Sequence, residues 1–289
     1  MAKGRELKGR IKSVENTRKI TKTMEMVATS KMKRAQDRVV AARPYAGALG
    51  DVIASLYSPD LAERFPLLRQ PAGKPKRAAV VLLTGNRGLA GAFNSNIIKE
   101  ARTLLSRLEG DGAEIELHAI GKKGLGFFRY LGRPIASSRT DVGDQPTSKM
   151  AGEIVDGLMA GFSTGKLDAV YLVYSRFVSA LSAVPTSERV LPVAKPDRKK
   201  GKSPDYLLYP SADAILAELL PLYVRNAVYR ALVETIAGFY SAQRTAMKNA
   251  TDNAGEMLNI LRRTYNRARQ AQITQEIAEI VGGSAALEG

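Results

Sequence analysis

The chain has 289 residues, and its 45% hydrophobic content supports a folded protein with a substantial core. It has no cysteine and only one histidine, His118, which excludes disulfides, thiolate metal sites and clusters of imidazole ligands. The 44 Lys and Arg residues outweigh 28 Asp and Glu, and the resulting charge of +16 predicts an anionic or acidic partner. No apolar run approaches the roughly 20 residues that a membrane span needs, and the charged first residues indicate a retained cytoplasmic segment.

Residues 3–56 are predicted to form one long helix. Its apolar or small residues recur every three or four positions and form one stripe, which is typical of a coiled-coil seam. The stripe consists of Leu7, Ile11, Val14, Thr21, Met24, Ala28, Met32, Ala35, Val39 and Ala42, with Arg18 in its one gap. Pro44 is expected to kink or locally break the helix. Residues 1–43 carry 13 Lys and Arg against 4 Asp and Glu, so much of the excess charge lies here.

A proline-rich loop at 57–77 separates this helix from a region in which strands and helices alternate. Strands are expected at 78–84, 114–120, 134–137 and 168–175, and helices at 94–108, 122–131 and 148–162. Such alternation predicts a mainly parallel, Rossmann-like sheet covered by helices. Residues 178–193 are expected to add an antiparallel edge or hairpin.

The C-terminal part begins after a basic linker at 194–205 and a possible short strand at 206–209. Ser211 is a candidate N-cap, and Pro221 is expected to kink the helix that follows. Residues 222–281 contain no proline and would form a helix about 90 Å long. This helix carries a second thin seam, made of Met247, Ala250, Ala254, Met257, Leu261, Tyr265 and Ala268.

Two matching seams at opposite ends of the chain predict that the terminal helices pair with each other. Because one compact domain connects them, the pairing should be antiparallel. The expected fold is therefore α/β, with a long antiparallel two-helix coiled coil and a central Rossmann-like domain. The expected domains are an N-terminal helix at 1–57, the α/β domain at 76–193 and a C-terminal helix at 206–287.

Two glycine-rich turns are the only candidates for ligand chemistry. The first, Thr84–Asn94, follows a strand and opens a helix, as phosphate-binding loops do, but it matches neither GxGxxG nor GK[ST]. The second, Gly121–Gly126, carries two lysines. A structural turn is favoured at both places, and His118 is interpreted as a core or edge residue. Because no nucleophile, base and oxyanion site come together, we expect neither catalysis nor a cofactor.

Long motifs at both ends resemble the gamma subunits of F-type ATP synthases. They are RIKSVENTRKITKTMEMVATSKMKRAQ (Arg10–Gln36) and ATDNAGEMLNILRRTYNRARQAQITQEIAEIVGG (Ala250–Gly283). In the middle, RGLAGAFN is similar to the family's RGLCG turn, with Ala90 in place of the usual cysteine and Asn86 in place of an acidic residue. The chain lacks both the cysteine-bearing insert of chloroplast gamma subunits and a transit peptide, which favours a bacterial type.

The resemblance implies a non-catalytic rotor shaft that couples proton flow through the membrane sector to sequential changes at the catalytic sites of the alpha3-beta3 ring. Its partners would be the alpha, beta, epsilon and c-ring subunits, with one copy per complex, peripheral to the cytoplasmic face of the bacterial cell membrane. By motif, the shaft contacts with beta are Met24, Arg244, Arg269, Gln270, Thr274 and Glu276. The contacts on the c-ring and epsilon side are Asp205, Tyr206 and Tyr209.

Two alternatives remain open on the sequence alone. A basic coiled-coil protein that binds nucleic acid would explain the charge, although no reader module is recognisable. A nucleotide-dependent α/β enzyme would explain the glycine-rich turns.

Overall fold

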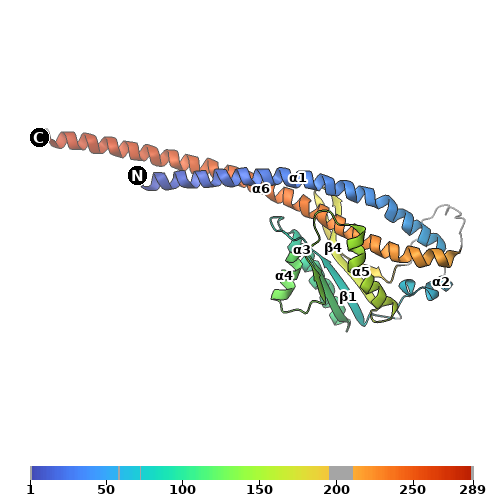
Figure 1. Cartoon of the computed structure of the whole chain (residues 1–289). Helices are drawn as coiled ribbons and strands as arrows, with labels where there is room; N and C mark the ends of the chain where they lie inside the picture. Colours follow the sequence, from blue (N-terminus) through green and yellow to red (C-terminus); the bar gives the residue numbers. More distant parts are fainter. Residues whose placement is uncertain (1, 58, 72, 195–210, 288–289) are drawn as a thin grey trace. The chain divides into compact units, whose positions relative to one another are not determined.

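The computed structural model describes residues 2–57, 59–71, 73–194 and 211–287. Its elements follow the order predicted from the sequence: a long helix comes first, a mixed α/β region follows and a second long helix comes last (Figure 1). The elements are α1 (Ala2–Leu56), α2 (Pro59–Arg64), the 3-10 helix η1 (Pro66–Leu68), β1 (Arg77–Leu83), α3 (Phe93–Gly110), β2 (Glu114–Ile120), α4 (Lys122–Tyr130), β3 (Ser137–Arg139), α5 (Ser148–Ser163), β4 (Ala169–Ser179), β5 (Ser182–Leu191) and α6 (Ala212–Leu287).

Several expectations about local structure are corrected. The segment expected to be a loop at 57–77 contains the short helices α2 and η1. Strand β3 begins at Ser137, where the expected strand ends, because its pairing with β2 starts there, at His118. Strand β4 extends to Ser179, since its second half pairs with β5. No helix boundary falls at either internal proline: α1 continues through Pro44 and α6 through Pro221.

The expected start of α6 is confirmed. Ser211 Oγ accepts a hydrogen bond of 3.2 Å from the backbone N–H of Ala214, as an N-cap side chain does. Asp213 in the first turn adds a favourable interaction with the helix dipole. The predicted strand at 206–209 lies outside the described residues.

The described chain divides into two compact units. One consists of residues up to 28 together with those from 243 onward, and the other consists of residues 29–242. Residues 29–56 of α1 and 212–242 of α6 therefore belong to the same unit as the sheet, whereas the expected domains assigned each terminal helix to a part of its own. We call the first the helix-pair unit and the second the sheet unit.

In the sheet unit, five strands lie in the order β3-β2-β1-β4-β5. Pairing is parallel between β1 and β2, β1 and β4, and β2 and β3, whereas β4 and β5 form an antiparallel hairpin. The predicted mainly parallel sheet with an antiparallel edge is thus confirmed. All residues of β1 after Arg77 are buried, because helices cover both faces of this central strand.

The two faces of the sheet meet different helices. Ala79, Val81 and Leu83 of β1 belong to the largest core cluster, which also contains buried residues of α1, α5 and α6. On the other face, Leu82 lies against Gly124 of α4, and α3 presents its own buried stripe to the strands. The sheet unit is therefore a three-layer α/β arrangement in which α6 forms part of one outer layer (Figure 1).

Glycine 238 permits the closest approach of α6 to the sheet. A Cβ at this position would lie 3.0 Å from both the Ala183 Cβ and the Ser175 Oγ, and 3.1 Å from the Phe93 ring. Any side chain here would push the helix away from β4 and β5, which explains why a glycine is found inside a long helix.

Candidate functional site on the helix pair

In the helix-pair unit, α1 and α6 lie side by side and run antiparallel. Thr21 and Thr251 are hydrogen-bonded through their Oγ1 atoms at 2.8 Å, and Arg262 Nη2 donates to Glu15 Oε1 at 2.6 Å. Moving toward the N-terminus on one helix thus corresponds to moving toward the C-terminus on the other. The predicted antiparallel pairing is confirmed.

The seam predicted from the sequence is mostly buried or half-buried, with one error on α6. Thr21, Ala28, Met247 and Ala254 are buried. Met257, however, is 53% exposed, and its neighbour Leu258 is 2% exposed and takes the place assigned to Met257. The error arises because a spacing of three from Ala254 reaches Met257, whereas the helix uses a spacing of four at this point.

Arg18, the residue in the gap of the α1 seam, lies beside Gly255 of α6. A Cβ on Gly255 would be 3.7 Å from Arg18 Nε and 3.8 Å from Arg18 Cζ, which is ordinary van der Waals contact. The Arg18 side chain therefore packs against α6 while its charge stays exposed.

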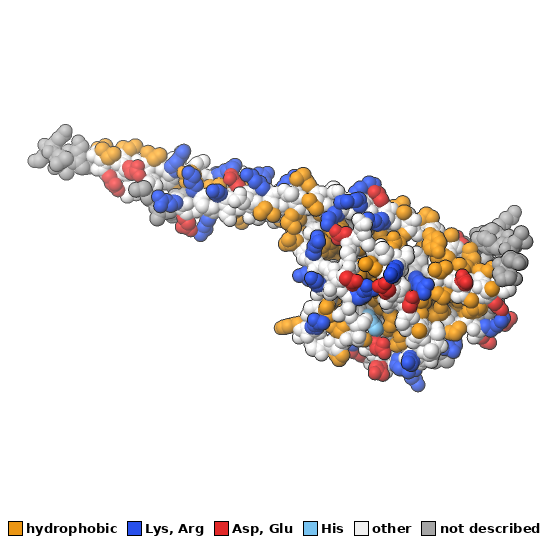
Figure 2. All heavy atoms as spheres, viewed as in Figure 1, with side chains coloured by type: hydrophobic (Ala, Val, Ile, Leu, Met, Phe, Trp, Pro, Cys, Tyr) orange, Lys and Arg blue, Asp and Glu red, His pale blue; other side chains and the backbone are white. Residues whose placement is uncertain are grey.

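A groove of about 720 Å³ lies beside the Arg18 side chain. It is lined by Glu15, Arg18, Lys19, Lys22, Thr23, Thr251, Asp252, Leu258 and Arg262. Four of these side chains are cationic and two are anionic, so the groove is basic. On the face in view in Figure 2, Lys and Arg side chains are spread along the helix pair. Such a surface fits an acidic partner.

The ion pairs around the groove are exposed. Glu15 and Arg262 keep 37% and 58% of their side-chain surface accessible, and the Lys248–Asp252 pair, at 3.2 Å, is more exposed still. Exposed pairs of this kind contribute about 0–1 kcal/mol each. They can orient a partner without fixing the helices rigidly to it.

The structure spreads the six predicted shaft contacts along the helix pair instead of gathering them. Arg244 and Arg269 are 25 positions apart on α6, which corresponds to about 37 Å along the helix axis. Met24 lies about one turn after Thr21 on α1. Because the two helices are antiparallel, this position is level with residues just before Thr251 on α6, in the direction of Arg244. The antiparallel register thus separates Met24 and Arg269 by several turns along the helix pair.

Exposure also differs among these residues. Met24 and Arg244 are half-buried, whereas Arg269, Gln270, Thr274 and Glu276 are exposed. Gln272 donates to Glu276 Oε1 at 2.8 Å, one helical turn away.

The predicted c-ring and epsilon contacts Asp205, Tyr206 and Tyr209 lie outside the described residues. The groove residues Arg18, Lys19, Lys22 and Arg262 were not among the predicted contacts, although the arginine in the gap of the α1 seam was a signal for this place.

The first glycine-rich turn is held by hydrogen bonds within the protein. The Gly85 N–H donates to Asn94 Oδ1 at 2.8 Å, and the Asn86 side chain donates to the carbonyls of Thr140 and Val142 at 3.0 and 2.9 Å. Asn86 Oδ1 in turn accepts from the Lys122 N–H at 2.9 Å. These groups are therefore occupied, which supports the structural interpretation of the turn over a phosphate-binding loop.

The second turn requires its first glycine. Gly121 has a φ of 98°, and a Cβ there would lie 2.1 Å from the Thr84 carbonyl oxygen. Thr84 Oγ1 accepts from the Gly124 N–H at 2.9 Å and contacts the Ile120 carbonyl at 3.1 Å. The turn joins the ends of β1 and β2 tightly, as expected of a structural element.

His118 is a half-buried residue of β2, where it pairs with Val81 of β1 on one side and Ser137 of β3 on the other. Its Nδ1 is 2.7 Å from Ser137 Oγ, and Nε2 is 3.7 Å from Glu116 Oε2. Burial lowers the pKa of His118, although Glu116 works in the opposite direction.

Among the described residues, no three His, Asp or Glu side chains gather in a way that could hold a metal ion. No helix of the described chain combines the length and apolar character needed to cross a bilayer.

The fold class is defined by terminal helices that pair antiparallel and by an α/β sheet region that lies between them in the sequence. Comparison with known proteins identifies the family. The family model described as ATP synthase matches residues 3–287. The ATP synthase gamma chain of Gemmatimonas aurantiaca is 67% identical over the full length of both chains, and that of Acidovorax sp. JS42 is 41% identical over 99% of this chain and 100% of its own.

The chain belongs to the ATP synthase gamma chain family. Solved structures agree with this assignment. A chain of the Tetrahymena thermophila mitochondrial ATP synthase central stalk and c-ring has 25% identity and a TM-score of 0.62, covering 80% of this chain and 99% of its own. A chain of the Euglena gracilis mitochondrial ATP synthase rotor shares the fold at 20% identity, with a TM-score of 0.67 and coverage of 94% and 99%. These comparisons do not support the nucleic-acid alternative.

Proposed function

We propose that this chain is the non-catalytic central rotor shaft of a bacterial ATP synthase. It couples proton flow through the membrane sector to sequential conformational change at the catalytic sites of an alpha3-beta3 ring. The observation that carries the proposal is the antiparallel helix pair with its thin seam of small residues and its exposed basic groove. A seam this thin buries little apolar surface, so a sheath of partner subunits would stabilise the pair.

The proposed partners are the alpha, beta and epsilon subunits and the c-ring, with one copy of this chain in each complex at the cytoplasmic face of the cell membrane. The basic groove favours acidic loops on the surrounding ring. On the membrane side, Asp205, Tyr206 and Tyr209 are proposed to contact the c-ring and epsilon. Capture of the tagged chain from solubilised membranes should return alpha and beta subunits, and their absence would overturn the proposal.

A rotor needs contacts that are individually weak. Each additional 1.4 kcal/mol that holds the shaft at one angle lengthens the waiting time there about tenfold. Exposed side chains such as Arg269 and Gln270 can form contacts of about 0–1 kcal/mol each, which orient the shaft without trapping it. Met24, Arg244, Thr274 and Glu276 are proposed to serve the same purpose at other levels of the helix pair.

The proposed rotor contact is tested by replacing Arg269 and Gln270 together with alanine in the complete enzyme. We expect ATP synthesis by inverted membrane vesicles to fall more than the amount of assembled complex. The double variant Asn266→Ala/Arg267→Ala is a matched control, because it removes the same charge from exposed positions one turn earlier on α6. Equal synthesis rates in the wild type and the Arg269/Gln270 variant would refute the assignment of these two residues.

A further inference from the structure

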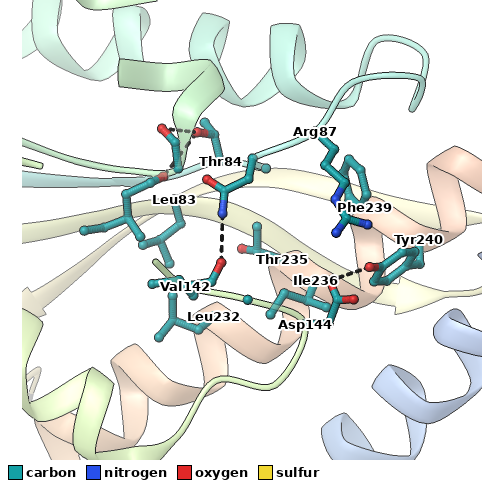
Figure 3. Close-up of a pocket in the computed structure, with 15 residues that line it drawn as sticks. Leu83, Thr84, Arg87, Val142, Asp144, Leu232, Thr235, Ile236, Phe239 and Tyr240 are labelled. Atoms are coloured by element: carbon teal, nitrogen blue, oxygen red, sulfur yellow. Dashed lines mark hydrogen bonds between the residues drawn. The ribbon is translucent and has the colours of Figure 1, made fainter. Parts of the chain in front are cut away.

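A cavity of about 180 Å³ lies in the sheet unit, between the sheet and α6 (Figure 3). It opens at the carboxyl ends of the two central parallel strands, where Leu83 and Thr84 follow β1 and Ile120 and Gly121 end β2. The strand order reverses between β1 and β4, next to the cavity, whose strand residues come from β1 and β2. Ligands of open α/β sheets bind outside the carboxyl ends of the strands.

Residues 140–144, which we call the strap, form one wall of the cavity. Asn86 holds the beginning of the strap through the carbonyls of Thr140 and Val142. Asp144 holds its end: the carboxylate accepts from Lys31 Nζ at 2.6 Å and from the Tyr240 hydroxyl. Arg38 Nη1 also donates to the Asp144 carbonyl oxygen at 2.8 Å. The strap is therefore tied to both α1 and α6.

The interior of the cavity is mainly apolar. Val142 of the strap and Leu232 and Ile236 of α6 line it, together with Leu83 (Figure 3). An apolar cavity of about 150 Å³ is large enough to bind benzene. This cavity thus has room for a compact apolar body of similar size.

Arg87 and Asp144 are the charged residues that line the cavity. Lys31 pairs with the Asp144 carboxylate, and Arg38 donates to the Asp144 carbonyl oxygen, so three cations lie near one carboxylate. Burial opposes the lowering of the Asp144 pKa, which is caused by the hydrogen bonds from Lys31 and Tyr240 with a smaller contribution from Arg87. Figure 3 shows the Arg87 side chain beside Phe239, directed toward Tyr240 and Asp144. Within the part of the chain that the structure describes, no group hydrogen-bonds to the Arg87 guanidinium, whereas the Asn86, Asp144 and Tyr240 side chains are all engaged. Arg87 thus has free donors beside an apolar cavity.

We propose that this cavity binds a small monocarboxylate with a compact apolar body, independently of the rotor role. The carboxylate pairs with the Arg87 guanidinium, whose fork of donors suits a carboxylate, and the apolar body lies among Val142, Leu232 and Ile236. The local excess of positive charge favours an anion over a neutral or cationic ligand. The strap closes one side of the site through its bonds to α1 and α6.

The proposal is tested with the full-length chain and 4-fluorobenzoate, followed by fluorine NMR titration. We expect saturable binding, with clearly weaker binding of the neutral 4-fluorobenzyl alcohol. Arg87→Gln should weaken 4-fluorobenzoate binding about tenfold, because it removes a charge-assisted contact. Arg129→Gln, which removes an exposed charge from α4, is the matched control and should leave binding unchanged.

Ile236→Phe should abolish binding by filling the cavity, provided that circular dichroism shows the fold retained. Arg87 is exposed, so Arg87→Gln keeps the test decisive even if the Ile236 variant does not fold. The proposal is overturned if 4-fluorobenzoate does not bind saturably, or if the two arginine variants bind it equally. Equal affinity for the neutral alcohol would refute the carboxylate class.

Discussion

Thr21 and Thr251 are 230 positions apart in sequence, yet their buried side-chain oxygens are 2.8 Å apart across the helix pair. Each also contacts a carbonyl of its own helix, Thr21 that of Arg18 and Thr251 that of Met247. Polar residues in a seam of small side chains fix the register of two helices, because any shift would leave a buried hydroxyl without its cross-helix partner.

The threonine pair yields a prediction for a double-mutant cycle. Thr21→Val and Thr251→Val should each lower the free energy of unfolding of the helix pair by about 0.5–1.5 kcal/mol. The double variant should cost little more than either single change, since the first substitution already removes the shared bond. Urea unfolding of the full-length chain measures this, with Thr17→Val as a control, because exposed Thr17 contacts only the Ser13 carbonyl. Strictly additive losses would contradict the coupling.

Substitution of Gly121 and of Gly126, the first and last glycines of the second glycine-rich turn, should have different effects. Gly121→Ala should destabilise the protein by about 2–4 kcal/mol, because its positive φ and its contact with the Thr84 carbonyl leave no space for a Cβ. Gly126→Ala should be neutral or stabilising by up to about 1 kcal/mol, since this helical glycine has nothing within 4 Å. Thermal unfolding of both variants compares them directly, and a tolerated Gly121→Ala would contradict the structure.

Glu234 is a buried carboxylate on α6 that accepts a hydrogen bond of 3.1 Å from the Phe177 N–H of β4, beside a register shift in the β4–β5 pairing. Glu234→Ala should lower the free energy of unfolding by about 1–3 kcal/mol, because it leaves that N–H unpaired. Glu234→Gln should cost less, since an amide oxygen can still accept the bond. Equal losses in the two variants, measured by urea unfolding, would show that the bond to Phe177 contributes little.

The same carboxylate has a consequence for pH dependence. Burial raises the pKa of Glu234, so the folded state retains this proton to a higher pH than the unfolded state does. The contribution of Glu234 protonation to the free energy of unfolding is complete below the ordinary glutamate pKa of about 4.3. It is lost as the pH rises through the raised pKa of the folded state. Glu234→Gln removes this loss, so its stability relative to the wild type should increase between pH 4 and pH 7.

The pKa of His118 shifts in the other direction and gives the opposite pH dependence. Burial lowers it, so the folded state binds this proton less readily than the unfolded state. The contribution of neutral His118 to the free energy of unfolding is complete above the ordinary histidine pKa of about 6.5. It is lost as the pH falls through the lowered pKa of the folded state. Between pH 7.5 and pH 5.5, His118→Gln should therefore lose less stability than the wild type. Urea midpoints at the two pH values test this, and parallel losses would refute it.

The order and type of the elements followed from local physics. The alternation of buried runs with helical stretches predicted β1, β2, α4 and α5 to within a few residues, because covered parallel strands and amphipathic helices have distinct periods. The antiparallel pairing of the terminal helices also followed, since matching seams joined by one compact region allow little else. The local break considered at Pro44 does not occur, because a long helix on both sides can hold a proline at the loss of one hydrogen bond. The kink expected at Pro221 stays a prediction.

The sequence by itself determined that the two ends would pair, that a mainly parallel sheet would lie between them and that the surface would be basic. Only the tertiary structure decided which residues meet: that Arg18 lies beside Gly255, that Leu258 replaces Met257 in the seam, and that Met24 lies several turns from Arg269. The physical reason is that periodicity identifies the face of a helix, whereas the axial register between two helices is set by particular contacts across the interface.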